Sequence, residues 1–192
     1  MLRVSGIKID VKCAENVLNK KTAKLLKVKE SDIKSLKIVK RSLDARKKDI
    51  HFVYTVNVEV KNEQAVRLTQ NITKTEDKPY APYCGKKGFE KRPVVIGFGP
   101  AGMFCALTLA EAGVRPVVLE RGQDVDERSK SVETFWKEGK LNTESNVQFG
   151  EGGAGTFSDG KLTTRIKNER CKYVLAEMIS AGAPEEISYI HN

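Results

Sequence analysis

Three glycines and one glutamate, held at fixed spacing, are the residues of this chain best suited to chemistry. Gly97, Gly99 and Gly102 follow a short apolar run, and Glu120 lies 18 residues after Gly102. Glycines at these positions permit, in turn, a tight bend, close approach of the backbone to a pyrophosphate, and close packing of a helix on a strand. A carboxylate at the fourth position accepts hydrogen bonds from the hydroxyls of an adenosine ribose. The spacing therefore predicts a binding site for an adenine dinucleotide.

The elements that must position these residues are a strand, a helix and a second strand. The β-branched runs at 94–96 and 117–119 are typical of buried parallel strands. A helix is predicted from Pro100 to Ala112, because proline suits the first helical position and Gly113 suits a helix end. The positive end of this helix would face the phosphates of the ligand. The cofactor contacts predicted in this segment are Gly97, Gly99, Pro100, Ala101, Gly102, Glu120 and Arg121.

These glycines alone do not separate FAD from NAD, and an ordinary βαβ unit without a ligand is the alternative to both. Glu120 would repel a 2′-phosphate, which disfavours NADP. A second small-residue segment, NVQFGEGGAGTFSDGKL at 146–162, offers successive N–H groups, hydroxyl donors and a nearby cation. Such a set suits another anionic contact or the edge of a flavin ring, whereas a flexible surface loop would not normally carry Phe149 and Phe157. The contacts predicted here are Gly152, Gly153, Ala154, Gly155, Thr156, Ser158 and Lys161.

The motifs GFGPAG, LERG and FGEGGAGTFSDGKL, all within 92–162, resemble a family of uncharacterised FAD-dependent dehydrogenases, or NAD(P)/FAD-dependent oxidoreductases. These are relatives of flavoproteins of the fumarate reductase and geranylgeranyl reductase type. The basic segment at 34–60 is similar to the amino-terminal region of that family. The resemblance implies FAD as the cofactor and NAD(P)H as a candidate electron donor. It also implies that the first glycines cradle the FAD pyrophosphate, that Glu120 holds the adenosine ribose, and that the second segment lies near the flavin. Arg128 would then contact a phosphate, the alternative being an exposed arginine on a helix.

Members of that family are much longer than this chain of 192 residues. The resemblance therefore implies an amino-terminal part of a larger flavoprotein, with an incomplete Rossmann-type domain and substrate-side residues beyond residue 192. A helix is predicted from Cys171 to Ala181, and Glu185 begins an element that the chain does not finish.

The amino-terminal region has the pattern of a small α+β domain. Strands are predicted at 2–11, 33–39 and 51–60, the last because apolar and polar residues alternate cleanly. Helices are predicted at 14–26 and near 63–70, with a charged turn at 42–49 between the second and third strands. A two-layer sandwich follows from this order. The whole chain is therefore predicted to be α/β: a small α+β domain followed by a Rossmann-type FAD-binding domain.

Charge divides the chain into two parts. Residues 1–92 hold 23 Lys and Arg against 11 Asp and Glu, whereas residues 93–192 hold 11 against 14. Together with the polar, turn-rich stretch that separates them, this predicts a basic domain at 1–75, a linker at 76–92 and a dinucleotide-binding domain at 93–192. The basic surface suggests RNA as a partner, the alternative being a solvated lysine-rich surface. Its residues are Lys37, Lys40, Arg41, Arg46, Lys47 and Lys48.

Composition limits the other classes of function. No apolar run reaches the ~18 residues that span a membrane, and the first residues lack a signal-peptide core, so a cytoplasmic protein is predicted. The four cysteines, at 13, 84, 105 and 171, are far apart, and with only two histidines no metal site is expected. The hydrophobic share of 40% is sufficient for a folded core.

These features predict an FAD-dependent oxidoreductase, a dehydrogenase or reductase, with a small-molecule substrate or an electron carrier as its partner. The flavin would transfer the electrons, and Lys161 could stabilise negative charge on the reduced ring. Asp159 and Ser158 lie beside it in the sequence, but no catalytic acid or base is assigned. Two alternatives remain: an NAD-dependent enzyme without flavin, and a flavoprotein that acts on RNA through its basic first domain.

Overall fold

A computed structural model describes residues 1–13, 17–46, 48–78, 80–82, 85, 88–158, 166 and 168–190 of this mixed α/β chain. Its contacts divide the chain into two compact units. The first contains Met1–Tyr80 and Asn168–Asn192, and the second contains Ala81–Lys167. This division groups the last 25 residues with the first unit, whereas the sequence predicted them to follow the dinucleotide-binding residues. The domain limits of 1–75, 76–92 and 93–192 stay a prediction.

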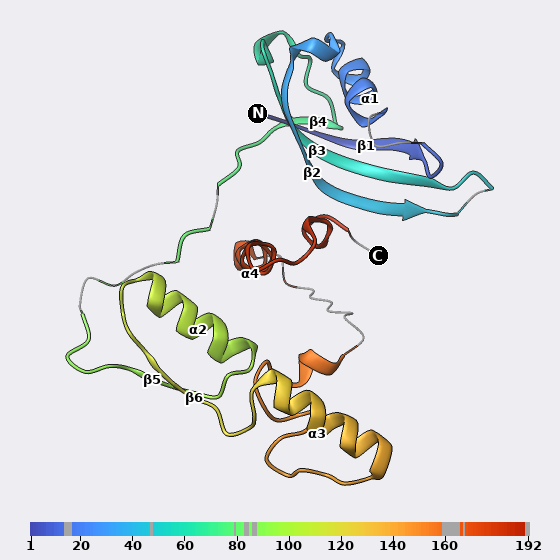
Figure 1. Ribbon diagram of the computed structural model, residues 1–192. Coiled ribbons are helices and arrows are strands. Elements are labelled where there is room, and N and C mark those ends of the chain that lie inside the picture. Colours follow the sequence, from blue (N-terminus) through green and yellow to red (C-terminus); the bar gives the residue numbers. More distant parts are fainter. Residues whose placement is uncertain are drawn as a thin grey trace. The chain divides into compact units, whose positions relative to one another are not determined.

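The first unit is built on a four-stranded antiparallel sheet with the order β2-β3-β1-β4. The helix α1 (Val17–Leu26) lies on one face of this sheet (Figure 1). Leu18 and Leu26 of α1 join the core with alternate residues of the two central strands. The strands are β1 (Leu2–Asp10), β2 (Ile33–Asp44), β3 (His51–Val60) and β4 (Ile72–Lys74), with short 3-10 turns at Glu30–Asp32 and Glu63–Ala65.

The alternating strand predicted at 51–60 is confirmed, and its apolar side is buried from Tyr54 to Val60. The predicted turn at 42–49 is too long at its start, because β2 continues to Asp44 and pairs there with His51. The helix predicted near 63–70 is wrong. The chain makes one 3-10 turn and then a tight bend in which Thr69 and Ile72 exchange backbone hydrogen bonds. Burial of Ile72 beside Val4 on β1 outweighs the local helical pattern.

The helix α4 (Glu169–Ser180) confirms the helix predicted at 171–181, and a 3-10 turn follows at Glu185–Ser188. Beyond this turn the chain meets the outer edge of β2. The N–H of Arg41 donates to the carbonyl oxygen of Tyr189 at 2.6 Å, and Arg41 forms a parallel bridge with Ile190. The guanidinium of Arg41 lies over the rings of Phe52 and Tyr189.

The second unit begins with two short parallel strands, β5 (Val94–Ile96) and β6 (Val117–Leu119), paired in register. Between them runs α2 (Pro100–Glu111), one residue shorter than predicted. The helix α3 (Val125–Glu138) and a 3-10 turn at Ala154–Phe157 follow. Among the described helices of the chain, none combines the length and the apolar composition that crossing a membrane requires.

Candidate dinucleotide-binding site

The turn from β5 into α2 depends on two glycines for different reasons. Gly97 has a φ of 90°, in the left-handed region that favours glycine, and a Cβ added there would have no neighbour within 4 Å. At Gly102 the limit is space, because an added Cβ would lie 2.0 Å from the carbonyl oxygen of Gly97 and 3.5 Å from a methyl group of Val95. The first turn of α2 is therefore in contact with the strand and loop that precede it.

The start of α2 leaves backbone donors without a carbonyl partner in the helix. Gly99 is the N-cap residue and provides no side-chain acceptor, and Pro100 has no N–H. The first intrahelical bond is the one from the Met103 N–H to the Gly99 oxygen, at 2.9 Å. The N–H groups of Ala101 and Gly102 precede it, so they are available to an anion at the positive end of the helix.

Glu120, directly after β6, accepts hydrogen bonds from the backbone through both carboxylate oxygens. The Gly122 N–H donates to one oxygen at 2.9 Å, and the Phe98 N–H donates to the other at 2.6 Å. These donors hold the pKa of Glu120 below its usual range, although burial opposes the shift. A carboxylate has about four lone-pair positions, so Glu120 can accept further hydrogen bonds while it ties the Gly97–Gly99 turn to β6.

The second glycine segment packs directly on the first. The Gly152 N–H donates to the carbonyl oxygen of Phe98 at 2.9 Å. A Cβ added to Gly153, whose φ is 68°, would lie 3.0 Å from Pro100 Cδ and 3.2 Å from Gly99 Cα. The structure thus brings together two segments that are about 50 residues apart in the sequence. The sequence had suggested only that the second segment lies near the flavin.

Arg128 organises this second segment from α3. Its side chain is fully buried, with a relative exposure of 0%, and its guanidinium lies 4.9 Å from the centre of the Phe157 ring. Burial lowers the pKa of Arg128, and the charge of Glu120 opposes that effect. The guanidinium donates to the carbonyl oxygens of Asn146, Val147, Gly150 and Glu151 and to the Thr156 hydroxyl. The expected alternative of an exposed helical arginine is wrong, and the donors that were predicted for a phosphate are directed at protein oxygens.

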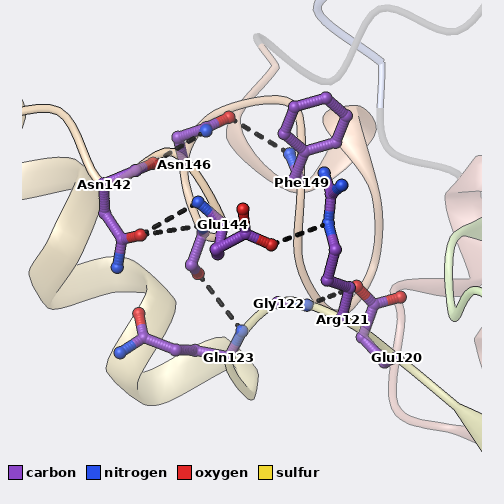
Figure 2. Close-up of polar contacts among 9 residues, drawn as sticks. Glu120, Arg121, Gly122, Gln123, Asn142, Glu144, Asn146 and Phe149 are labelled. Atoms are coloured by element: carbon purple, nitrogen blue, oxygen red, sulfur yellow. Dashed lines mark hydrogen bonds and ion pairs between the residues drawn. The ribbon is translucent and has the colours of Figure 1, made fainter.

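The segment between α3 and the second glycine run is held by asparagine turns (Figure 2). The Asn142 side chain accepts from the N–H groups of Glu144 and Ser145, and the Asn146 side chain accepts from those of Gln148 and Phe149. The buried Ser145 hydroxyl in turn accepts from the Gln123 N–H, which joins this loop to the residues after β6.

Arg121 lies on the outside of the same loop, where Figure 2 shows it beside Glu144. Its Nε is 3.2 Å from a Glu144 oxygen, and its guanidinium lies 4.6 Å from the centre of the Phe149 ring. Arg121 was also predicted to contact the cofactor. Unlike Arg128, it is exposed to solvent.

Two carboxylates cap α3. Asp124 accepts from the N–H groups of Asp126 and Glu127, and Glu151 accepts from that of Val125 at 2.8 Å. The pattern Asp-x-x-Glu from 124 to 127 is a capping signal that the sequence analysis missed. The sequence contains a weaker indication that Arg128 is buried. It lies one helical turn before the apolar Val132, which is also buried.

The structure therefore gathers most of the predicted contacts in one region of the second unit. The residues of the first turn, Glu120, and the run from Gly152 to Ser158 lie in this region, and Ser158 ends the 3-10 turn. Lys161 and Asp159 lie outside the described residues, as does Cys84. In the described ranges no group of three or more His, Cys, Asp or Glu side chains is arranged to hold a metal ion.

Comparison with known proteins identifies the class of this region. Residues 92–157 match the model of an FAD binding domain, and residues 1–59 match that of a domain of unknown function, DUF8436. An uncharacterized protein of Clostridium beijerinckii is 51% identical over 198 residues, which cover 98% of this chain and 36% of that protein. The chain thus spans about a third of the length of this relative. The match to an FAD binding domain indicates that the chain binds FAD.

The contact between Gly102 and Gly97 predicts the effect of one added methyl group. Gly102→Ala should destabilise the second unit by about 1–3 kcal/mol, because the carbonyl of Gly97 must move. Gly88→Ala, where an added Cβ has open space, is the control and should change stability by less than about 0.5 kcal/mol. Urea unfolding followed by the fluorescence of Trp136, the one tryptophan of the chain, measures both. Equal stability of the two variants would contradict the close packing.

Removal of the Arg128 guanidinium should loosen residues 146–157. Arg128→Met leaves the carbonyl oxygens that it binds without their charged donor, at a cost of roughly 3 kcal/mol. We expect proteases to cleave this variant within 146–157 at least several times faster than the wild type. Arg121→Met removes an exposed guanidinium that contacts Glu144 and Phe149 from outside the loop and should change the rate little. Comparable rates for the two variants would show that Arg128 does not order the segment.

The lowered pKa of Glu120 predicts a pH-dependent contribution to stability. The carboxylate form is favoured in the folded state, so its contribution is present above the ordinary glutamate pKa, about 4.3, and is lost as the pH falls through the folded value. Wild type should therefore be more stable than Glu120→Gln at pH 7, and the difference should shrink below about pH 4. Urea unfolding at both pH values tests this, with Glu133→Gln on α3 as the control. A pH-independent difference would refute the assignment.

Proposed function

We propose that this chain supplies the ADP-binding part of an FAD-dependent dehydrogenase or reductase of the cytoplasm. The observation that carries the proposal is the turn from β5 into α2. Close packing leaves no room for a side chain at Gly102, and two N–H groups at the start of the helix are open to an anion. The FAD binding domain that covers residues 92–157 supports the same assignment. The partner of the flavin would be a small-molecule substrate or an electron carrier, with NAD(P)H as a candidate donor.

The pyrophosphate of FAD would lie at the start of α2. The N–H groups of Ala101 and Gly102 would donate to it, and the bare Cα of Gly99 would let the backbone approach it. Pro100 begins the helix without adding a donor that needs a partner. Gly97 would act indirectly, since it sets the shape of the turn, and Gly102 would contribute both to that shape and through its N–H.

The adenosine ribose would lie at Glu120. Each carboxylate oxygen already accepts one backbone N–H, which orients the group and leaves lone pairs for the ribose hydroxyls. Because a 2′-phosphate would meet this negative charge, we propose that NADP does not bind at this position.

The flavin end would involve the second glycine segment. Gly152, Gly153, Ala154 and Gly155 would offer small backbone donors, with the hydroxyls of Thr156 and Ser158 beside them. Arg128 would hold this segment and not touch FAD, because its donors bind protein oxygens. When bound, the flavin supplies the electron transfer, and Lys161 would stabilise negative charge on it.

The strands of this site are open on their apolar sides. Ile96 is 86% exposed, Val94 is 55% exposed and Leu119 is 54% exposed, although parallel strands are normally covered on both faces. We propose that further elements of the longer protein cover these strands and complete the flavin site. The chain by itself would then bind FAD more weakly than the full-length protein.

Absorption spectroscopy tests this proposal directly. The protein from the full reading frame, purified without added cofactor, should show two flavin bands and release FAD on denaturation. The 192-residue chain should bind added FAD with quenching of Trp136 fluorescence, and Glu120→Gln should raise the dissociation constant about 10-fold, whereas Glu133→Gln should not. Absence of flavin from the full-length protein, even with FAD supplied, would favour the NAD-dependent alternative.

A further inference from the structure

The helix α1 and the residues just after it carry a concentrated positive charge. Residues 17–29 contain five lysines and no Asp or Glu. Four of these side chains, which we call the lysine face of α1, are exposed: Lys20, Lys24, Lys27 and Lys29. The fifth, Lys21, is half-buried and donates to the carbonyl oxygen of Lys8 at 2.6 Å.

Among the described residues, the lysines of the lysine face differ from lysines on α3 and α4, because they form no ion pairs with acidic residues. In the part of the chain that the structure describes, none of these four lysines forms an ion pair. By contrast, three lysines on α3 and α4 each lie next to a glutamate of their own helix. These pairs are Lys130–Glu127, Lys137–Glu133 and Lys172–Glu169.

The fold does not require this charge. The buried side of α1 consists of Leu18, Thr22, Ala23 and Leu26, so the lysines play no part in the core. Lys20 lies in the first helical turn, where the helix dipole disfavours a cation, and it is one turn from Lys24, where like charges repel. The lysine face therefore stabilises the helix less than an alternating pattern of charges would.

The basic cluster that the sequence suggested as an RNA surface is already engaged in part. Arg46 binds Asp44 through two nitrogens, Lys37 lies 3.2 Å from Asp77, and Arg41 is held between two aromatic rings. Asp44 has its pKa strongly lowered by Arg46. Lys47 lies outside the described residues. Lys40 and Lys48 of that cluster are exposed, but three of its other cations are engaged, whereas none of the four lysines of the lysine face has an acidic partner among the residues that the structure describes.

We propose that the lysine face of α1 binds the phosphate backbone of duplex RNA. Protein interfaces are depleted in lysine and enriched in aromatic residues, which makes a protein partner a poor match. Single strands require aromatic side chains for base stacking, and residues 17–29 include none. Duplex RNA is recognised mainly through its phosphates, its 2′-hydroxyls and its shape, a mode in which cations that contact the backbone are sufficient for much of the affinity. Lysine is well suited to phosphate as a flexible point charge.

A matched pair of triple variants tests the proposal on the whole 192-residue chain. Lys20→Gln, Lys24→Gln and Lys27→Gln are combined in one protein, and Lys130→Gln, Lys137→Gln and Lys172→Gln in the other, so both lose the same charge. Anisotropy of a fluorescein-labelled 20-base-pair RNA duplex gives the dissociation constant from about 50 to 200 mM salt. Circular dichroism confirms that both variants fold.

We expect the first variant to bind the RNA at least 10-fold more weakly than the wild type and to reduce the salt slope by about three. The second variant should bind like the wild type. Equal losses in both variants, or no binding by the wild type at low salt, would overturn the proposal. Tighter binding to the matching DNA duplex, or to poly-glutamate, would also overturn it and assign the surface to that polyanion. FAD binding is not involved in any of these readouts, so this inference and the proposed function fail independently.

Discussion

The buried guanidinium of Arg128 is the interaction on which the arrangement of the second unit depends. A buried cation is tolerated only where hydrogen bonds replace those that water would make. Here four backbone carbonyls and one hydroxyl serve this purpose, and all come from residues 146–156. A segment with so many small residues has few side chains of its own to pack, so its conformation is determined from outside, by α3.

The small size of these residues also explains how the two glycine segments pack against each other. Gly99 and Gly153 approach so closely that a side chain on Gly153 would press on Pro100, and the Gly152 N–H reaches the Phe98 carbonyl. Glu120 adds a second link, because it accepts a hydrogen bond from the Phe98 N–H. The turn before α2 is therefore held at Phe98 both by a carboxylate and by a glycine backbone. Such support from rigid surroundings is what positions a binding loop accurately.

The two units differ in how far their apolar residues are covered. The first has a closed core in which Leu2, Val56 and Val58 have no exposed surface. In the second, α2 has no fully buried residue, although most of its residues are apolar. A helix as apolar as this beside open parallel strands is typical of an interior layer, which agrees with a chain that spans 36% of the length of the Clostridium beijerinckii relative.

Local sequence patterns determined the strand, turn and helix around Gly97–Gly102, because glycine, proline and β-branched residues restrict the backbone directly. The alternation of residues 51–60 likewise determined β3. The helix predicted near 63–70 failed, since pairing of Ile72 with β1 is a contact between residues about 70 apart. Only the tertiary structure placed Arg128 inside, joined residue 153 to residue 99, and gave Lys37 and Arg41 of β2 their partners. Each of these depends on which distant groups are neighbours, and the spacing of residues along one chain does not contain that information.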